Sequence, residues 1–403
     1  MEAEPAGDNY MKMKSALSEL EGLLSEDIVS AKNREKNALD ELAGPLADSI
    51  VLHGAGNLGR KTLHGLRRAG VEPVAFSDNN AELWGKTLDG VPVFSPFDAA
   101  RKFGKSAVFV VTIWGGAITD TMADRCRPLL ELGCSKVLNF GLLFWKYPEI
   151  FGPHYSYDLP HKLLEQGDEV RRAFELWADD ASRSEYVSHV RWRLKMDFDG
   201  MPRPVRHPMY FPDDIVEVSN DEVFVDCGAY DGDTLKTFLE KCGGNFSEFH
   251  ALEADPKNAS KLRGFIATLP ADLQRKITTH ELAVGAMHGK VFFDAVGTAS
   301  SAVGQGSLEI KCAPLDEILA SSQPTWIKMD IEGSEPDALV GATSLFLENS
   351  PVLAICVYHS QSHLWSIPLQ MNSLIQNYSF FLRPHVFESW DLVCYAIPNR
   401  RLL

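Results

Sequence analysis

The sequence of 403 residues lacks three features that would each define a class of protein. It has no apolar run long enough to cross a bilayer, so a helical membrane span is not expected. Its seven cysteines form no C-x-x-C pair, which removes the usual sign of a zinc or thiol redox site. It has no basic cluster, and 39 Lys and Arg against 55 Asp and Glu give a net charge of -16. Such a charge repels phosphate backbones, so small molecules or neutral glycans are better partners than nucleic acid.

The start of the chain also lacks a secretory pattern. Met1 to Asp8 has neither a basic beginning nor an apolar stretch. We therefore expect a cytoplasmic protein with reduced, mostly buried cysteines. With 45% hydrophobic residues the composition is that of a globular protein, and 403 residues exceed one ordinary core. Two globular units with connecting helices are predicted.

The order of apolar and charged residues divides the chain into four predicted segments. Residues 10 to 42 carry leucines at helical spacing, which predicts a helical arm that packs on its own chain or on a partner in an oligomer. Strand and turn signals then alternate with helical spacing in two long stretches, separated by a Pro-rich region with helical segments. The predicted boundaries are a helical arm at 1–45, an α/β domain at 46–147, a helical connector at 148–220 and a second α/β domain at 221–403.

The first α/β segment contains a glycine pattern between a strand and a helix. The apolar run Ser49–His53 is followed at once by Gly54, Gly56 and Gly59, which match G-x-G-x-x-G, and then by helical spacing. Asp78 ends the next predicted strand, 19 residues after Gly59. This is the context expected of a nucleotide site, in which the acid binds a ribose. A Rossmann-like scaffold that needs its glycines only for packing is an equal alternative.

A second set of residues follows this motif. The runs Val74–Asn80 and Gly85–Val93, about fifty residues with their surroundings, resemble the nucleotide-sugar-binding domains of sugar-modifying acyltransferases and related enzymes. The resemblance implies that the first domain presents a nucleotide or a nucleotide-linked sugar.

The second α/β segment contains a different glycine turn. The buried-strand signal Glu222–Val225 leads through Gly228 and Gly232 into a helix, and the free N–H groups at the start of that helix favour an anionic group such as a carboxylate. The next strand ends in Glu253, 21 residues after Gly232, where a Rossmann unit places the acid that accepts ribose hydroxyls. The pattern is D-x-G-x-x-x-G, so the turn predicts an amino acid joined to a nucleoside and not a dinucleotide.

Four motifs of this segment occur in a fixed order. They are Phe224-Val-Asp-Cys-Gly-Ala-Tyr-Asp-Gly-Asp-Thr234, Ala251-Leu-Glu-Ala-Asp-Pro256, Leu282-Ala-Val-Gly285 and Ile327-Lys-Met-Asp-Ile-Glu-Gly-Ser-Glu335. Together with Pro351–His359 and a closing hairpin, they resemble the FkbM-family methyltransferases over about Tyr210 to Pro398. The resemblance implies a class I fold with a seven-stranded sheet and an antiparallel last strand. It also implies S-adenosylmethionine as cofactor and O-methylation as the activity.

The resemblance also implies the positions that hold the cofactor. The first motif would bind the methionine end, Glu253 the ribose, and the segment after the third strand the adenine. The residues are Asp226, Cys227, Gly228, Ala229, Tyr230, Asp231, Gly232, Thr234, Glu253, Ala283, Val284 and Asp330.

Three further side chains are candidates for catalysis. Asp330 and Glu332 follow one predicted strand and His359 ends the next, so all three are expected at the edge where open α/β sheets bind ligands. Any of them would serve as the base that takes the proton of an acceptor hydroxyl. Lys328 lies on the strand face of Asp330, so part of the cluster is alternatively a structural ion pair. Two carboxylates and an imidazole form an acceptable metal shell, but nothing in their spacing demands a metal.

The sequence as a whole predicts an α/β protein with two Rossmann-like domains in tandem. The predicted function is methyl transfer from S-adenosylmethionine to a hydroxyl of a saccharide or polyketide-like metabolite. The alternative is an NAD(P)- or nucleotide-sugar-dependent oxidoreductase that uses the N-terminal G-x-G-x-x-G domain.

Overall fold

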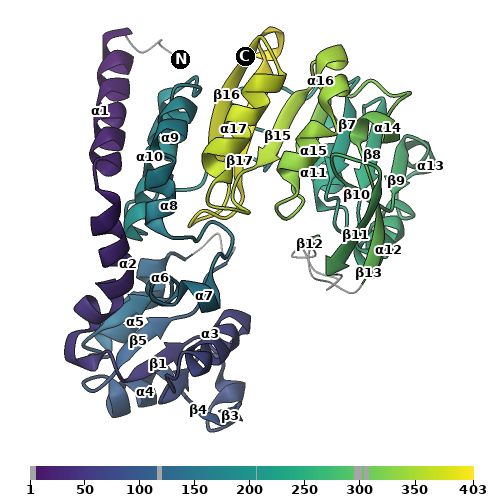
Figure 1. Cartoon of the computed structure of the whole chain (residues 1–403). Helices are drawn as coiled ribbons and strands as arrows, with labels where there is room; N and C mark the ends of the chain where they lie inside the picture. The colour runs from purple at the N-terminus through teal and green to yellow at the C-terminus, as the bar shows by residue number, and fades with distance from the viewer. Residues whose placement is uncertain (1–5, 116–119, 206, 295–301, 304–307) are drawn as a thin grey trace.

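The structure, a computed structural model, describes residues 6–115, 120–205, 207–294, 302–303 and 308–403. Two α/β units, each built on a largely parallel sheet, lie at the two ends of the molecule and are joined by helices (Figure 1). The first described residue, Ala6, and the C-terminus both lie at the end opposite the first unit. The predicted fold class is confirmed.

The N-terminal arm consists of two helices, α1 (Ala6–Leu24) and α2 (Ile28–Ala43), where the sequence pattern predicted one. The break has a local cause, because the side chain of Asp27 accepts a hydrogen bond from the backbone N–H of Ser30 and so caps α2. The arm packs on its own chain: α1 runs along α10 (Asp180–Lys195), and α2 contacts helices of the first unit and of the linking region.

The first unit is a six-stranded sheet in the order β3-β4-β2-β1-β5-β6, parallel except where β3 pairs with β4. β1 and β5 consist of buried residues only, as expected for central strands covered on both faces. The strands are β1 (Ile50–His53), β2 (Ala75–Ser77), β3 (Thr87–Leu88), β4 (Val91–Phe94), β5 (Val108–Val111) and β6 (Val137–Asn139). The helices are α3 (Asn57–Arg68), α4 (Pro96–Phe103), α5 (Met122–Glu131) and α6 (Gly141–Lys146), with short 3-10 turns at Gly44–Leu46 and Ala81–Leu83.

The region between the two sheets is packed into both units. Its helices are α7 (Pro148–Phe151), α8 (Pro160–Glu165), α9 (Gly167–Phe174) and α10. Tyr186 and Leu194 of α10 belong to the core of the second unit, whereas Trp192 of the same helix belongs to the core of the first. One helix therefore joins the two cores, and the predicted domain boundaries stay a prediction.

The second unit is a seven-stranded sheet in the order β16-β17-β15-β14-β7-β8-β9, in which only β17 is antiparallel to its neighbours. This is the predicted sheet with its closing hairpin. The strands are β7 (Val223–Cys227), β8 (Glu248–Leu252), β9 (Ile277–His280), β14 (Trp326–Met329), β15 (Val352–Cys356), β16 (Tyr378–Pro384) and β17 (Leu392–Pro398). The helices are α11 (Asp233–Cys242), α12 (Pro256–Ile266), α13 (Ala271–Gln274), α14 (Leu315–Ile318), α15 (Glu335–Val340), α16 (Thr343–Asn349) and α17 (His363–Leu374), with a 3-10 turn at Asn399–Arg401.

A small third sheet, which the sequence pattern did not predict, lies beside the second unit. Its order is β10-β13-β11-β12, with strands β10 (Ala283–Val284), β11 (Gly289–Asp294), β12 (Ala302–Val303) and β13 (Leu308–Ala313). The predicted adenine segment, Ala283–Val284, follows the third strand of the main sheet, β9, and forms strand β10 of this extra sheet.

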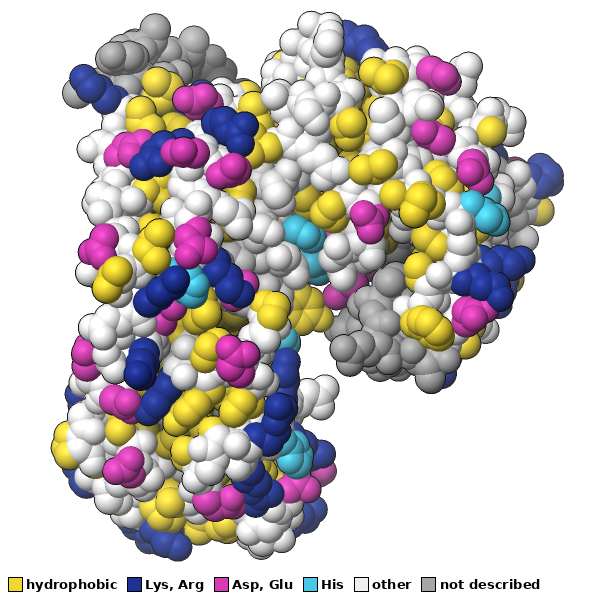
Figure 2. Space-filling view, viewed as in Figure 1, with side chains coloured by type: hydrophobic (Ala, Val, Ile, Leu, Met, Phe, Trp, Pro, Cys, Tyr) yellow, Lys and Arg dark blue, Asp and Glu magenta, His cyan; other side chains and the backbone are white. Residues whose placement is uncertain are grey.

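The surface carries charges of both signs. On the face shown in Figure 2, Lys and Arg side chains are mixed with Asp and Glu side chains over the arm and the first unit. None of the helices in the described part of the chain combines the length and apolar character that a bilayer crossing requires.

Candidate active site

A pocket opens at the carboxyl ends of β7, β8 and β14, the edge at which open α/β sheets bind ligands. The space between its walls is about 760 Å³, a figure that includes space open to solvent. The lining residues are Tyr210, Gly228, Tyr230, Asp233, Thr234, Leu252, Glu253, Ala254, Asn258, Leu282, Ala283, Val284, Lys328, Asp330, Ile331, Glu332 and Ser334.

The glycine turn between β7 and α11 forms one wall. Gly228 has a φ of +85°, and a Cβ there would collide with the backbone carbonyl oxygen of Asp330. Gly232 has a φ of +97°, and a Cβ there would come within 2.7 Å of Phe265. The sequence analysis explained these glycines by the close approach of a ligand and by the start of the helix. The structure shows that both also allow other parts of the protein to pack closely against the turn.

A buried ion pair supports this turn from below. Lys328 Nζ lies 2.8 Å from Asp226 Oδ1, and both side chains are buried. The same ammonium donates a hydrogen bond of 2.7 Å to the carbonyl of Gly228. Burial lowers the pKa of Lys328, but the charges of Asp226 and Asp330 outweigh it and raise the pKa above its ordinary value. The expected structural ion pair of Lys328 is therefore formed with Asp226. Asp226 does not line the pocket, and the pair holds the glycine turn in place.

Glu253 lies at the end of β8, on the pocket wall. Its Oε2 accepts a hydrogen bond of 2.8 Å from the N–H of Tyr230, and its Oε1 accepts one of 2.7 Å from the N–H of Asp255. Each carboxylate oxygen can still accept a further hydrogen bond, so the side chain remains able to receive both hydroxyls of a ribose. Burial raises the pKa of Glu253 to about 7, although these two backbone bonds lower it.

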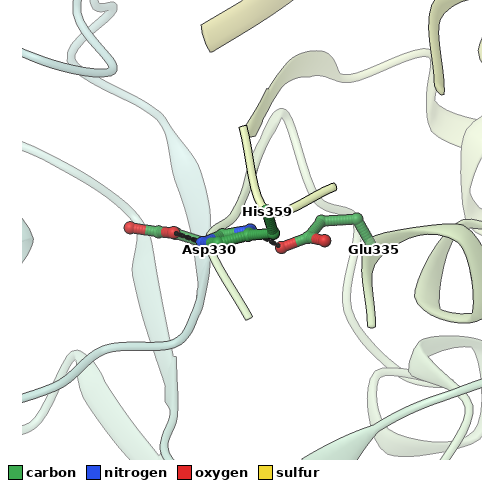
Figure 3. A group of neighbouring side chains, drawn as sticks. All are labelled: Asp330, Glu335 and His359. Atoms are coloured by element: carbon green, nitrogen blue, oxygen red, sulfur yellow. Dashed lines mark ion pairs between the residues drawn. The ribbon is translucent and has the colours of Figure 1, made fainter. Parts of the chain in front are cut away.

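His359 lies between two carboxylates (Figure 3). Its Nε2 is 3.2 Å from Asp330 Oδ1, and its Nδ1 is 2.8 Å from Glu335 Oε1. Burial lowers the pKa of His359, but the charge of Glu335 and the contact with Asp330 outweigh it and raise the pKa well above its ordinary value. The two carboxylates thus favour the cationic imidazolium, and each of its nitrogens faces one of them.

Among the described residues, the ligand atoms of Asp330, Glu335 and His359 lie close enough together to hold a metal ion. The two carboxylates, however, contact opposite nitrogens of the ring. A metal ion would take one nitrogen only, so this arrangement fits a salt-bridged triad better than a metal centre.

Asp330 also binds two tyrosines. Its Oδ2 accepts a hydrogen bond of 2.7 Å from the hydroxyl of Tyr210, and its Oδ1 accepts one of 3.2 Å from Tyr358. Burial raises the pKa of Asp330, but the contact with His359 and the charge of Lys328 outweigh it and hold the pKa below its ordinary value. The carboxylate is therefore a firmly ionised part of the wall.

Glu332 has a different environment. Its side chain is 14% exposed, and its Oε1 lies 3.9 Å from His359 Nε2. Burial raises the pKa of Glu332 to about 7, with the charge of His359 acting in the opposite direction and a hydrogen bond from Tyr155 also lowering it. Its backbone has a φ of +55°, an uncommon conformation for a residue with a Cβ. Of the three catalytic candidates, Glu332 alone combines a place on the pocket wall with a pKa near neutrality.

The structure divides the predicted residues into two groups. Those on the pocket wall are Gly228, Tyr230, Thr234, Glu253, Ala283, Val284, Asp330 and Glu332. Those that do not line the pocket are Asp226, Cys227, Ala229, Asp231, Gly232 and His359. Tyr210 and Asn258 line the pocket but were not predicted, and Tyr210 lies in the Pro-rich region, where no local pattern indicates a site.

The glycine turn of the first unit is more tightly packed. A Cβ at Gly54, whose φ is +108°, would meet the side chain of Ile113, and a Cβ at Gly59 would collide with the carbonyl oxygen of Gly54. Gly56 faces open space. Asp78 Oδ2 accepts a hydrogen bond of 2.6 Å from the N–H of Ala55. Two of the three glycines are thus explained by packing.

Comparison with solved structures supports the fold of the whole chain. The crystal structure of methyltransferase FkbM from Methylobacillus flagellatus KT matches with a TM-score of 0.76 and 23% identity, over 96% of this chain and 99% of that chain. UDP-D-quinovosamine 4-dehydrogenase from Vibrio fischeri matches 23% of this chain and 75% of its own, at 20% identity, but its TM-score of 0.20 supports no conclusion.

Comparison of the sequence with known families gives a more specific result. No curated protein matches the chain. The family model described as the methyltransferase FkbM domain matches residues 226–382, which include the glycine turn, Glu253, Asp330, Glu332 and His359. Residues 226–382 therefore match the FkbM methyltransferase domain, and this match supports a methyltransferase that depends on S-adenosylmethionine.

Proposed function

We propose that this protein transfers the methyl group of S-adenosylmethionine to a hydroxyl group of a saccharide or a similar small metabolite, with Glu332 as the general base. The observation that carries the proposal is the pocket in which a glycine turn, Glu253 and Glu332 converge.

The residues of the pocket fit this cofactor. The pocket lies at the glycine turn and combines polar with apolar walls, and Glu253 offers free acceptor capacity to a ribose diol. The apolar side chains of Leu282, Ala283 and Val284 suit the face of an adenine ring. When bound, S-adenosylmethionine supplies a methyl group on a positively charged sulfur.

The remaining task of the protein is to hold the acceptor hydroxyl and to remove its proton. His359 is cationic and Asp330 is ionised with its oxygens already hydrogen-bonded, so neither is well suited to take a proton near pH 7. Glu332, with a pKa raised to about 7, matches the operating pH that general base catalysis favours. The cation of His359 keeps a share of Glu332 ionised and ready to act.

The environment of Glu332 supports a saccharide acceptor. Tyr155 lies beside it, with its ring 5.0 Å from that of Trp390 and 6.4 Å from that of His359. Aromatic faces next to hydrogen-bonding groups suit ligands that are amphipathic, as sugar rings are.

Two measurements test the proposal. Calorimetric titration is expected to show binding of S-adenosylhomocysteine and none of NAD, and the reverse result would favour the oxidoreductase alternative. Incubation with S-adenosylmethionine labelled in its methyl group and fractionated saccharide and metabolite extracts is expected to give a labelled product that has gained one methyl by mass spectrometry. Label found only on nitrogen or carbon would overturn O-methylation.

A nucleotide or nucleotide-sugar at the first unit is the second candidate. The hydrogen bond from the Ala55 N–H to Asp78 reproduces the one from the Tyr230 N–H to Glu253, and Gly56 faces open space. Titration with UDP-N-acetylglucosamine tests it, using Asp78→Ala as the matched variant. Binding that survives this substitution unchanged would place the nucleotide elsewhere.

A further inference from the structure

The loop between β16 and β17, residues 385–391, is held in an uncommon conformation. Glu388, Ser389 and Asp391 have φ values of +63°, +73° and +48°, although none of them is glycine. Such conformations persist only where the surrounding structure imposes them. Because β16 is parallel to β15 and β14, this loop lies at the same edge of the sheet as the pocket.

The first unit supplies the contacts that hold the loop. Arg125 of α5 forms an ion pair of 2.8 Å with Glu388, and the two side chains are only 5% and 2% exposed. The N–H of Met122 donates to the same carboxylate, and the indole of Trp114 donates a hydrogen bond of 3.3 Å to the carbonyl of Glu388. Trp114 follows the carboxyl end of β5, so the carboxyl edges of the two sheets meet at this loop.

The other end of the loop contacts the residues that surround Asp330 and Glu332. The ring of Trp390 lies 4.5 Å from that of Trp114 and 5.8 Å from that of Tyr358. Tyr358 donates to Asp330, and Asp391 is hydrogen-bonded to Tyr358. Tyr155, the neighbour of Glu332, lies against Trp390 on the side toward the linking helices.

The linking region adds a second support. The hydroxyl of Ser156 donates 2.7 Å to the carbonyl of Tyr358, and the hydroxyl of Ser389 lies 3.1 Å from that of Ser156. A displacement of the loop is therefore transmitted both to Tyr358 and to the segment that carries Tyr155.

We propose that Arg125 is a positioning residue: by binding Glu388 it fixes the 385–391 loop, and the first α/β unit thereby completes the acceptor side of the site in the second unit. The inference rests on the proposed methyl transfer. It gives the first unit a role in the reaction that requires no nucleotide of its own.

The test separates cofactor binding from turnover. Glu388 and Arg125 do not line the cofactor pocket, so Arg125→Ala is expected to leave the Kd for S-adenosylhomocysteine within about twofold of the wild type. The kcat for methyl transfer to the acceptor found by the labelling screen is expected to fall about a hundredfold, because a displacement of about 1 Å costs that much. Arg125→Lys, which keeps the charge but loses the fork of donors, is expected to recover part of the rate.

A readout that needs no acceptor accompanies the kinetics. Hydrogen exchange of peptides that cover residues 385–391 is expected to accelerate in Arg125→Ala, since the amide of His385 is bonded to the carbonyl of Asp391 within this loop. If Arg125→Ala does not fold, Glu388→Gln takes its place, because the amide oxygen can still accept the Met122 N–H.

Arg401→Ala is the matched control. Arg401 forms an ion pair with Glu222, whose side chain is fully buried, at the opposite edge of the same sheet, directly before β7. Arg401→Ala is expected to lower the free energy of unfolding without changing kcat.

An unchanged kcat in Arg125→Ala overturns the inference, as does an equal loss of kcat and cofactor affinity, which indicates general damage. If the wild-type protein does not bind S-adenosylhomocysteine, the proposed function is overturned, and the inference with it. If hydrogen exchange at residues 385–391 is unchanged in Arg125→Ala, the inference alone is overturned.

Discussion

The two glycine turns of this molecule place an acidic side chain in the same position but surround it differently. In the first unit Asp78 accepts a hydrogen bond from the turn at Ala55, and in the second unit Glu253 accepts one from the turn at Tyr230. The first turn spans residues 54–56 before α3 begins, whereas the second spans 228–232 before α11 begins. The shorter turn brings Gly59 of α3 onto the carbonyl of Gly54, while the longer one forms a wall of the pocket.

The strand beside each turn sharpens the contrast. β5 lies next to β1 as β14 lies next to β7. After β5 the chain reads Thr112-Ile-Trp-Gly115, and after β14 it reads Asp330-Ile-Glu-Gly333. The hydroxyl of Thr112 donates 2.8 Å to the carbonyl of Gly54, and Trp114 packs against the 385–391 loop. The second unit has carboxylates at both places, so the same framework presents ionisable side chains in one unit and packing residues in the other.

Glu332→Gln is expected to have the largest effect. Loss of a general base lowers kcat by about a hundredfold to ten-thousandfold, while binding of S-adenosylhomocysteine stays close to normal. Glu348→Gln, at an exposed carboxylate of α16, is the comparison and is expected to leave kcat unchanged. Turnover of Glu332→Gln near the wild-type rate would remove this carboxylate from the mechanism.

Glu253→Ala is expected to weaken binding of S-adenosylhomocysteine about tenfold to a hundredfold, the value of hydrogen bonds to a charged acceptor. Asp78→Ala, its counterpart in the first unit, is expected to leave this affinity unchanged. Calorimetry on both variants checks the assignment, and equal losses in both would show that the two turns contribute alike.

The glycines of the first turn provide a test by stability. Gly59→Ala is expected to lower the free energy of unfolding by about 1–3 kcal/mol, because its Cβ would collide with the Gly54 carbonyl. Gly56→Ala, which faces open space, is expected to change it by less than about 0.5 kcal/mol. Urea unfolding measures both. Equal effects would contradict the packing explanation of this motif.

The pH dependence of cofactor binding is expected to follow the ionisation of Glu253. Burial raises the pKa of Glu253 to about 7, so below that pH the group carries a proton and has lost acceptor strength. The affinity for S-adenosylhomocysteine is therefore expected to strengthen by at most about tenfold per pH unit up to pH 7 and to level off above it. Glu253→Gln removes the ionisation, so a persistent pH dependence in that variant would point to another group.

Local sequence patterns were sufficient for the elements that line the pocket of the second unit. The strand before the second glycine turn, Glu253 at the end of the next strand and Asp330 at the end of β14 were all predicted from apolar runs and spacing, because a parallel sheet brings carboxyl ends to one edge. The same patterns left two readings of the first unit open, since G-x-G-x-x-G is compatible both with a nucleotide site and with close packing of a helix on a strand.

The residues that complete the site had no local signal. Tyr210 binds Asp330 across 120 positions of the chain, and Arg125 binds Glu388 across 263. Both pairs join segments whose own patterns are a Pro-rich corner and an ordinary amphipathic helix. Their partners are set by how the two units pack, which no spacing along the chain expresses.

By itself the sequence determined the two sheets and the places where acidic side chains leave their strands, because hydrophobic periodicity and glycine turns act over a few residues. Only the tertiary structure decided which of the two carboxyl groups, Asp330 or Glu332, has a pKa near 7. Burial and the charge of His359 set the pKa of Glu332, while the same cation and Lys328 keep Asp330 ionised. Electrostatic effects of this kind depend on distances across the folded molecule, and those distances exist only once the strands, the linking helices and the first unit are in place.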